Sequence, residues 1–77
     1  MLYVLVKERN GSWSVVGAHR SERQAHATRD TYQRAIDSDK KKGHKPLHQK
    51  VRVVEADRPD VAIGFCTSVL DNPNVIK

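Results

Sequence analysis

The stretch LYVLVKERNGSWSVVGAHRSERQ, residues 2–24, decides the fold of this chain. Two runs rich in apolar residues, Leu2–Val6 and Trp13–Val16, flank the dipeptide Asn10-Gly11. Asn-Gly suits the two positive-φ positions of a type I′ turn, whose twist matches that of paired strands. The stretch therefore predicts an antiparallel β-hairpin that closes in a two-residue turn.

The alternation of side chains along a strand assigns the two faces of this hairpin. The two-residue turn would pair Arg9 with Ser12, Val6 with Val15, and Val4 with Gly17. The expected core face carries Leu2, Val4, Val6, Trp13 and Val15, and the outer face carries Tyr3, Leu5, Lys7, Arg9, Ser12, Ser14 and Val16. Trp13 lies near the turn opposite Glu8, where it either caps the core at its rim or serves as an exposed anchor for a partner, because Trp is enriched at binding hot spots.

A helix is expected from Glu22 to about Asp39. Ser21 and Gln24 have the spacing of a capping box, in which each side chain satisfies a free backbone donor at the helix start. Ala25, Thr28, Tyr32, Ala35 and Ile36 recur at helical spacing and form a narrow apolar stripe. Lys40–Lys42 favour the negative end of the helix dipole, and Gly43 suits the position just beyond the cap.

The rest of the chain predicts one or two further strands. Alternating apolar residues favour a third strand over Leu47–Ala56, and Asp57–Asp60 is typical of a turn. Val61–Phe65 alternates again and predicts a fourth strand, with Val61, Ile63 and Phe65 on one side, that continues irregularly to Leu70. Residues 71–77 either add a short edge pairing or fray as a C-terminal tail.

These elements predict one α+β domain over residues 1–77. We expect a three- to four-stranded, mainly antiparallel sheet with one helix on one face, in the order β-β-α-β(-β). A chain of 77 residues with 38% hydrophobic content folds as a single small core. The apolar run Leu2–Val6 is too short for a signal peptide or a membrane span, so we expect a cytoplasmic protein without a membrane partner. The single cysteine, Cys66, forms no internal disulfide and is expected to be a small buried apolar residue.

The positive charge of the chain is concentrated in one segment. The net charge is +5, and positions 40–52 hold no acidic residue but six basic ones: Lys40, Lys41, Lys42, Lys45, Lys50 and Arg52. Such a field attracts phosphates, acidic protein surfaces or anionic lipid headgroups. The alternative is a solvated loop that keeps a small protein soluble.

Catalytic and cofactor signatures are poor. His44 and His48 have the four-residue spacing of a metal-binding histidine pair. They lie on either side of Pro46 in a loop, however, where that spacing does not bring two side chains together. The acidic pairs near residues 37–39 and 55–57 lie among lysines or at a turn, and the glycines are scattered rather than grouped in a phosphate loop. We therefore expect no metal, no cofactor and no enzymatic activity.

A nucleic-acid-binding domain is one candidate class. Tyr3 beside Lys7 and Arg9 on the outer hairpin face is the one candidate stacking ring, and single-strand binders need several. A hairpin that enters a major groove through Lys7, Arg9, Ser12 and Ser14 is the other form of this hypothesis. The lysines of residues 40–52 would then contact phosphates.

The element order carries a resemblance. Hairpin, helix and strand, with Trp-Ser-Val-Val-Gly at residues 13–17 before a helix that begins after Ser21, resemble many very small proteins of phages and mobile elements, among them polymerase inhibitors and anti-CRISPR proteins. The resemblance covers Leu2–Ala56 in element order and rests on no motif, so it carries over no functional residue. Many of those proteins are acidic nucleic-acid mimics. This chain is basic, so the resemblance implies an inhibitor that blocks an acidic or nucleic-acid-associated surface. The order also resembles small DNA-binding domains of integrases and plant-type regulators.

The leading expectation is thus a non-enzymatic binding protein of phage or mobile-element type that inhibits a host protein or nucleoprotein complex with an acidic surface. The alternative is a domain that binds nucleic acid directly. The candidate contact residues for either are Lys40, Lys41, Lys42, Lys45, Lys50, Arg52, Trp13, Lys7 and Arg9. A continuous basic stripe over the hairpin and residues 40–52 would favour nucleic acid, and an exposed apolar patch beside an isolated basic loop would favour a protein partner.

Overall fold

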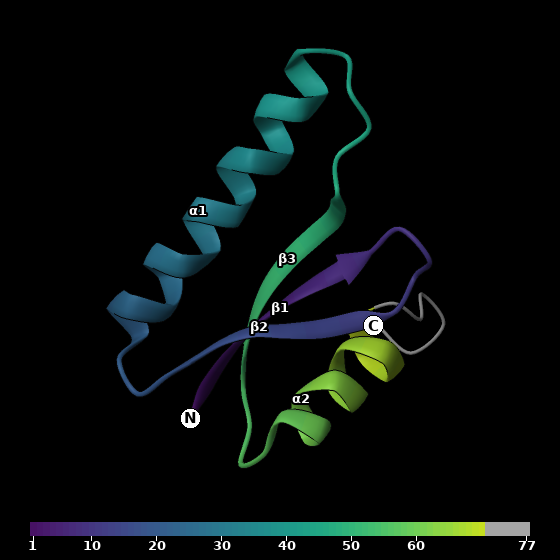
Figure 1. Cartoon of the computed structure of the whole chain (residues 1–77). Helices are drawn as coiled ribbons and strands as arrows, with labels where there is room; N and C mark the ends of the chain where they lie inside the picture. Colours follow the sequence, from purple (N-terminus) through teal and green to yellow (C-terminus); the bar gives the residue numbers. More distant parts are fainter. Residues whose placement is uncertain (71–77) are drawn as a thin grey trace.

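The computed structural model describes residues 1–70 as an α+β fold, which confirms the predicted class (Figure 1). The elements in chain order are β1 (Leu2–Glu8), β2 (Trp13–His19), α1 (Glu22–Lys41), β3 (His48–Glu55), α2 (Pro59–Phe65) and a π-helical turn, η1 (Cys66–Leu70). The three strands form one antiparallel sheet in the order β2-β1-β3. The predicted C-terminal tail, residues 71–77, lies outside the described residues.

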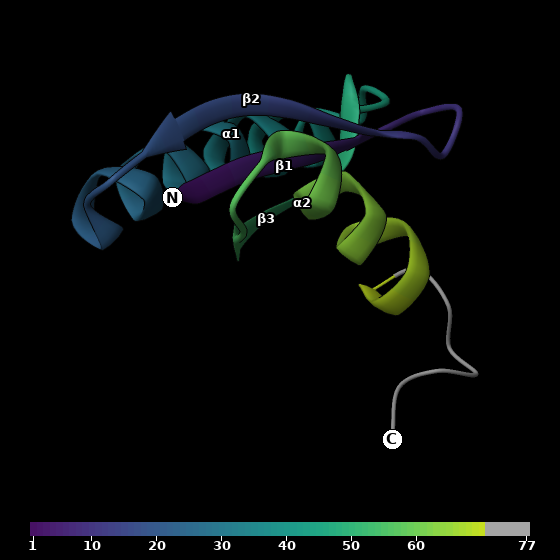
Figure 2. The ribbon, with the colours of Figure 1, turned by 90° about the horizontal axis from the view of Figure 1, so that it is seen from below.

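The sheet lies between the two helices, α1 and α2 (Figures 1 and 2). Four consecutive residues of β1, Tyr3 to Val6, are buried, because the central strand has a helix on each side. A continuous apolar run is typical of a strand that is covered on both faces. The sequence indicated a helix on one face of the sheet only, and α2 covers the other face.

The core on the α1 face unites the helix with β1 and β3. Val4, Val6 and Val51 pack there against Ala25 and Ile36 of α1. Tyr32 is partly buried against the same core, in agreement with the predicted helical stripe. The core on the α2 face consists of Tyr3, Leu5, Trp13, Val54, Ala62 and Cys66. The Cys66 side chain is fully buried, as predicted.

The hairpin closes in a three-residue loop rather than the predicted type I′ turn. The Glu8 amide donates to the Ser12 carbonyl at 2.8 Å, and the Gly11 amide donates to the Glu8 carbonyl at 3.0 Å. Gly11 has φ +92°, whereas Asn10 does not have a positive φ. A type I turn followed by one left-handed residue is the usual three-residue hairpin loop.

The longer loop reverses the predicted faces of residues 13–16 in β2; Val16, predicted on the outer face, packs against the core of the α1 face. Leu5 pairs with Val15 and Val6 with Ser14, so the predicted Val6–Val15 pair is wrong. A bulge between Val4 and Leu5 then restores the predicted pairing of Val4 with Gly17. Trp13 and Val15 therefore lie on the α2 face with Tyr3 and Leu5, because a shift of one residue exchanges the two faces.

The predicted fourth strand, Val61–Phe65, is wrong because these residues belong to helix α2. Pro59 occupies the first turn of α2, where its missing amide proton costs nothing. The buried residues, Ala62 and Cys66, are four positions apart, as one face of a helix requires.

Two local details of the neighbouring elements also differ from prediction. Ser21 is the N-cap of α1, as predicted, but its side chain makes no capping hydrogen bond. Leu47, the predicted first residue of the third strand, precedes β3 and is 69% exposed.

Candidate functional site

The hairpin loop is attached to the segment that precedes β3. The Arg9 guanidinium donates from Nε to the Pro46 carbonyl at 3.1 Å and from Nη2 to the Lys45 carbonyl at 2.9 Å. The Gln49 side-chain amide donates to the carbonyls of Glu8 and Arg9, at 3.0 Å each. Side-chain hydrogen bonds to backbone carbonyls thus join the hairpin loop to the segment before β3, about 36 residues later in the sequence.

The Glu8 carboxylate, which belongs to this junction, contacts a histidine. Glu8 Oε1 lies 2.6 Å from His48 Nδ1, with both side chains at least partly shielded. The His48 ring also packs edge-on against Tyr32, with ring centroids 5.8 Å apart. Glu8 is therefore directed toward His48 and α1.

Three cations lie on the α2 face of the sheet, near the hairpin loop. Lys7 pairs with Lys50 across β1 and β3, and Leu5 pairs with Arg52. Because alternate residues share a face, Lys7, Lys50 and Arg52 project to the same side. Like charges placed directly opposite each other on a sheet are destabilising by themselves.

The remaining basic residues extend this group toward the end of α1. Lys40 and Lys41 form the last turn of α1, and Lys42 is its C-cap. Gly43 has φ +83° and redirects the chain into the loop that contains Lys45. We call the following set the basic surface: Lys40, Lys41, Lys42, Lys45, Lys50, Arg52, Lys7 and Arg9.

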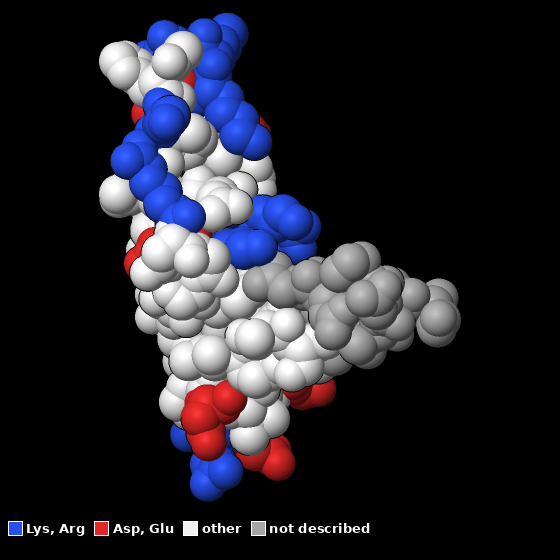
Figure 3. Space-filling model, turned by 90° about the vertical axis from the view of Figure 1, so that its right-hand side faces the viewer, with Lys and Arg blue, Asp and Glu red and all other residues white. Residues whose placement is uncertain are grey.

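On the face shown in Figure 3, basic residues dominate the upper half, and both basic and acidic residues lie at the lower end. In the view of Figure 3, Lys and Arg side chains extend from the top, where α1 ends, to the middle of this face, and Asp and Glu side chains gather mostly at the lower end. Within residues 1–70, the ion pairs that form involve Glu22, Asp30, Glu8 and Asp60, and none includes a lysine of residues 40–50 or Arg52. The ammonium groups of that segment are therefore available to an external anion.

The aromatic candidates do not belong to the basic surface. Trp13 is 5% exposed and packs in the core of the α2 face, which confirms its structural interpretation and excludes its use as an exposed anchor. Tyr3 is 7% exposed in the same core, so its ring offers no stacking platform. Of the predicted outer hairpin face, Tyr3 and Leu5 lie in the core beneath α2.

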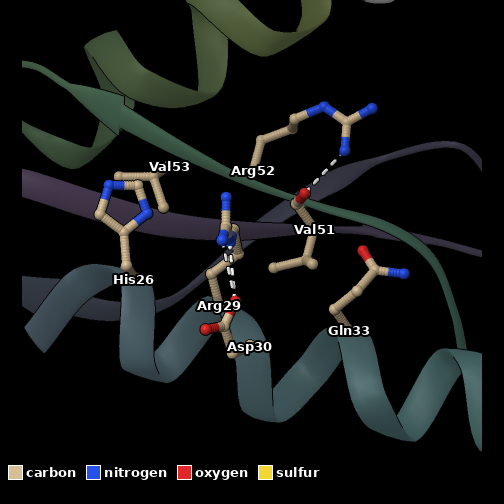
Figure 4. Close-up of a pocket in the computed structure, with 7 residues that line it drawn as sticks. All are labelled: His26, Arg29, Asp30, Gln33, Val51, Arg52 and Val53. Atoms are coloured by element: carbon tan, nitrogen blue, oxygen red, sulfur yellow. Dashed lines mark hydrogen bonds and ion pairs between the residues drawn. The ribbon is translucent and has the colours of Figure 1, made fainter. Parts of the chain in front are cut away.

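Three features of the surface were not predicted from the sequence. Val61 and Phe65, one helical turn apart on α2, are exposed, as is Leu47. A groove of about 500 Å³ lies between α1 and β3. Its α1 wall includes His26, Arg29 and Gln33, and its β3 wall runs from Val51 to Val53 (Figure 4). The period-2 pattern of β3 indicated a strand but not that its outer edge would be open.

The geometry of the described residues contains no preformed metal centre. Within residues 1–70, His, Cys, Asp and Glu side chains do not gather in a group of three or more that could hold a metal ion. None of the helices described here is long and apolar enough to cross a membrane. The sequence matches no protein-family model, and neither a curated protein nor a solved structure is significantly similar to the chain.

Proposed function

We propose that this protein binds nucleic acid through the phosphate backbone, without catalysis, and that the basic surface makes the contacts. The observation that carries the proposal is the junction of the hairpin with residues 40–52, where Lys7 lies opposite Lys50 and Arg9 holds Lys45 and Pro46. A continuous basic stripe is the electrostatic footprint of a nucleic-acid-binding protein.

Duplex nucleic acid fits this surface better than single strands do. Sequence-independent single-strand binders stack bases on exposed aromatic rings, whereas Tyr3 and Trp13 are buried. Lysine contacts phosphate as a flexible point charge and gives little bidentate recognition of bases. We therefore expect binding with little sequence preference, in the cytoplasm.

The rival class is the inhibitor that docks on a host protein, of phage or mobile-element type. It is supported by Val61 and Phe65, an exposed apolar pair on α2. Its expected anchor, Trp13, is buried. A pair of apolar side chains without that anchor is a weaker argument than the joined basic residues.

Fluorescence anisotropy with a random-sequence DNA duplex and the matching single strand tests the proposal. We expect stronger binding to the duplex, with the logarithm of affinity falling linearly in the logarithm of salt. The slope should be about −0.9 per phosphate contacted, hence about −4.5 for roughly five contacts. Absence of duplex binding at physiological salt would refute the proposal and leave the inhibitor as the remaining class.

A charge-matched pair of variants localises the contact. Lys50→Glu with Arg52→Glu should reduce the salt slope by about 2 and weaken binding at least tenfold. Arg23→Glu with Arg58→Glu changes the net charge equally, at the start of α1 and beside Asp60. Equal losses in the two variants would show that net charge alone attracts the duplex and would contradict an assigned surface.

A further inference from the structure

The outer edge of β3 presents backbone groups that pair with no strand of residues 1–70. The Ala56 amide donates to the Met1 carbonyl at 3.1 Å, and these residues continue the β1–β3 register directly beyond the Leu2–Glu55 pair. In an antiparallel ladder, hydrogen-bonded and non-hydrogen-bonded pairs alternate. The amide and carbonyl groups of Val51, Val53 and Glu55 therefore point away from β1.

No strand of the described chain covers this edge. The sheet order is β2-β1-β3, so β3 has a strand on one side only within residues 1–70. The Val51 carbonyl accepts a hydrogen bond from its neighbour's side chain, Arg52 Nη1, at 2.8 Å. An edge strand with free backbone groups is a template for an added strand.

The groove between α1 and β3 provides space beside this edge (Figure 4). The polar side chains of its α1 wall are bonded to each other or to nearby residues. Arg29 contacts Asp30 at 2.9 Å, and the Gln33 amide donates to Asp37 at 3.0 Å. What remains for an occupant is the backbone edge and the partly buried side chain of Val53, because Val51 is only 1% exposed.

The two sides of β3 differ in chemistry. Val51 and Val53 project toward α1 and its core, whereas Lys50 and Arg52 project to the α2 side and are exposed. An added strand alternates its side chains in the same way. Its apolar residues would meet the partly buried Val53, and its acidic residues would meet Lys50 and Arg52.

We propose that the open edge of β3 captures an extended acidic segment of a partner protein, with alternating apolar and acidic residues, as a fourth strand. A second copy of this chain is a poorer occupant, because antiparallel pairing of β3 with itself brings Lys50 and Arg52 against their counterparts. This site differs from the phosphate-binding surface because it uses the backbone of β3. Lys50 and Arg52 belong to both sites. The acidic segment and nucleic acid therefore compete.

A synthetic peptide of about eight residues, alternating valine and glutamate, is the probe. Titration into the isotopically labelled protein, followed by amide hydrogen exchange, should protect the amides of Val51, Val53 and Glu55. Two control peptides are matched to it: one of the same composition with the glutamates in a single block, and one with lysine for glutamate. We expect both to bind at least tenfold more weakly. Equal binding of the block peptide would reduce the effect to charge attraction and overturn the proposal.

Val53→Pro removes one outward amide without removing a donor from the β1–β3 ladder, and Val53→Ala is the control for lost side-chain volume. Relative to Val53→Ala, Val53→Pro should weaken the peptide about tenfold, since a buried acceptor on the peptide loses its partner. Duplex DNA should bind the two variants equally, so a failure of either proposal is distinguishable from a failure of the other. Equal peptide binding by the two variants would overturn strand addition. A wild-type dimer in analytical sedimentation that Val53→Pro dissociates would also overturn the proposal, because a second copy would then occupy the edge. The hydrogen-exchange result on the wild-type chain holds independently if Val53→Pro does not fold.

Discussion

Lys7 lies directly opposite Lys50 across the β1–β3 ladder. Such a pair lowers stability by itself, and the adjacent pair on that face, Leu5 with Arg52, adds a third cation. A sheet optimised only for stability would place opposite charges there. The arrangement is understandable if the positive potential itself is the function.

Replacement of Lys50 should therefore separate stability from binding. Lys50→Glu creates an opposite-charge pair with Lys7, which should stabilise the fold by about 0.2–1 kcal/mol at low salt and raise Tm by a few degrees. The same change should weaken duplex binding. Thermal denaturation and anisotropy measure the two effects. Lys45→Glu, in the loop, is the control: it should weaken binding without raising Tm, and a similar rise there would contradict the pairing argument.

Arg9 acts through geometry as well as charge. Arg9→Lys keeps the charge but loses the planar group that reaches two carbonyls, at Lys45 and Pro46. We expect faster amide hydrogen exchange in residues 43–47 and a several-fold increase in Kd for duplex DNA. Arg23→Lys, on exposed α1, should change neither. An unaltered Kd for Arg9→Lys would show that Arg9 contributes only its charge and that its two hydrogen bonds to carbonyls do not affect binding.

The sequence predicted the hairpin, α1 and β3 because each has a strong local signal. Asn10-Gly11 marks the loop, Ser21 the helix start, and alternation the third strand. The Val4–Gly17 pair follows from that loop even though the loop has three residues, because the bulge in β2 compensates for the additional residue. The three-residue loop sets the faces of Trp13 and Val15, and Asn10-Gly11 alone does not distinguish that loop from a two-residue turn.

The basic run of residues 40–52 was also visible in the sequence, but its junction with the hairpin was not. The Lys7–Lys50 pair depends on the β1–β3 register, and a tertiary register between strands 43 positions apart has no signature in either segment alone. The open edge of β3 depends on α2 replacing a fourth strand. Short apolar runs such as Val61–Phe65 suit either a helix or a strand by periodicity alone.

The loop conformation at Gly11 gives a prediction about stability. Gly11 has a positive φ, so Gly11→Ala should destabilise the fold by about 1 kcal/mol, although a side chain there would meet no neighbouring atom. Gly64→Ala is the matched control: a Cβ there also meets open space, φ is not in the left-handed range, and the residue lies in α2. That change should stabilise by a few tenths to about 1 kcal/mol. Urea denaturation measures both, and two changes of the same sign would contradict the assignment.

The helical structure of α2 can be tested directly, because a helix and a strand over these residues would bury different side chains. In the helix, Ala62 is fully buried and Val61 is 46% exposed. Ala62→Asp places a carboxylate in the core of the α2 face and should cost about 3 kcal/mol or more, or prevent folding. Val61→Asp should alter the free energy of unfolding by no more than about 0.5 kcal/mol. In the strand predicted from the alternation, Val61 would be the buried residue and Ala62 the outward one, so the order of the two losses would be reversed. Urea denaturation followed by circular dichroism distinguishes the two orders directly.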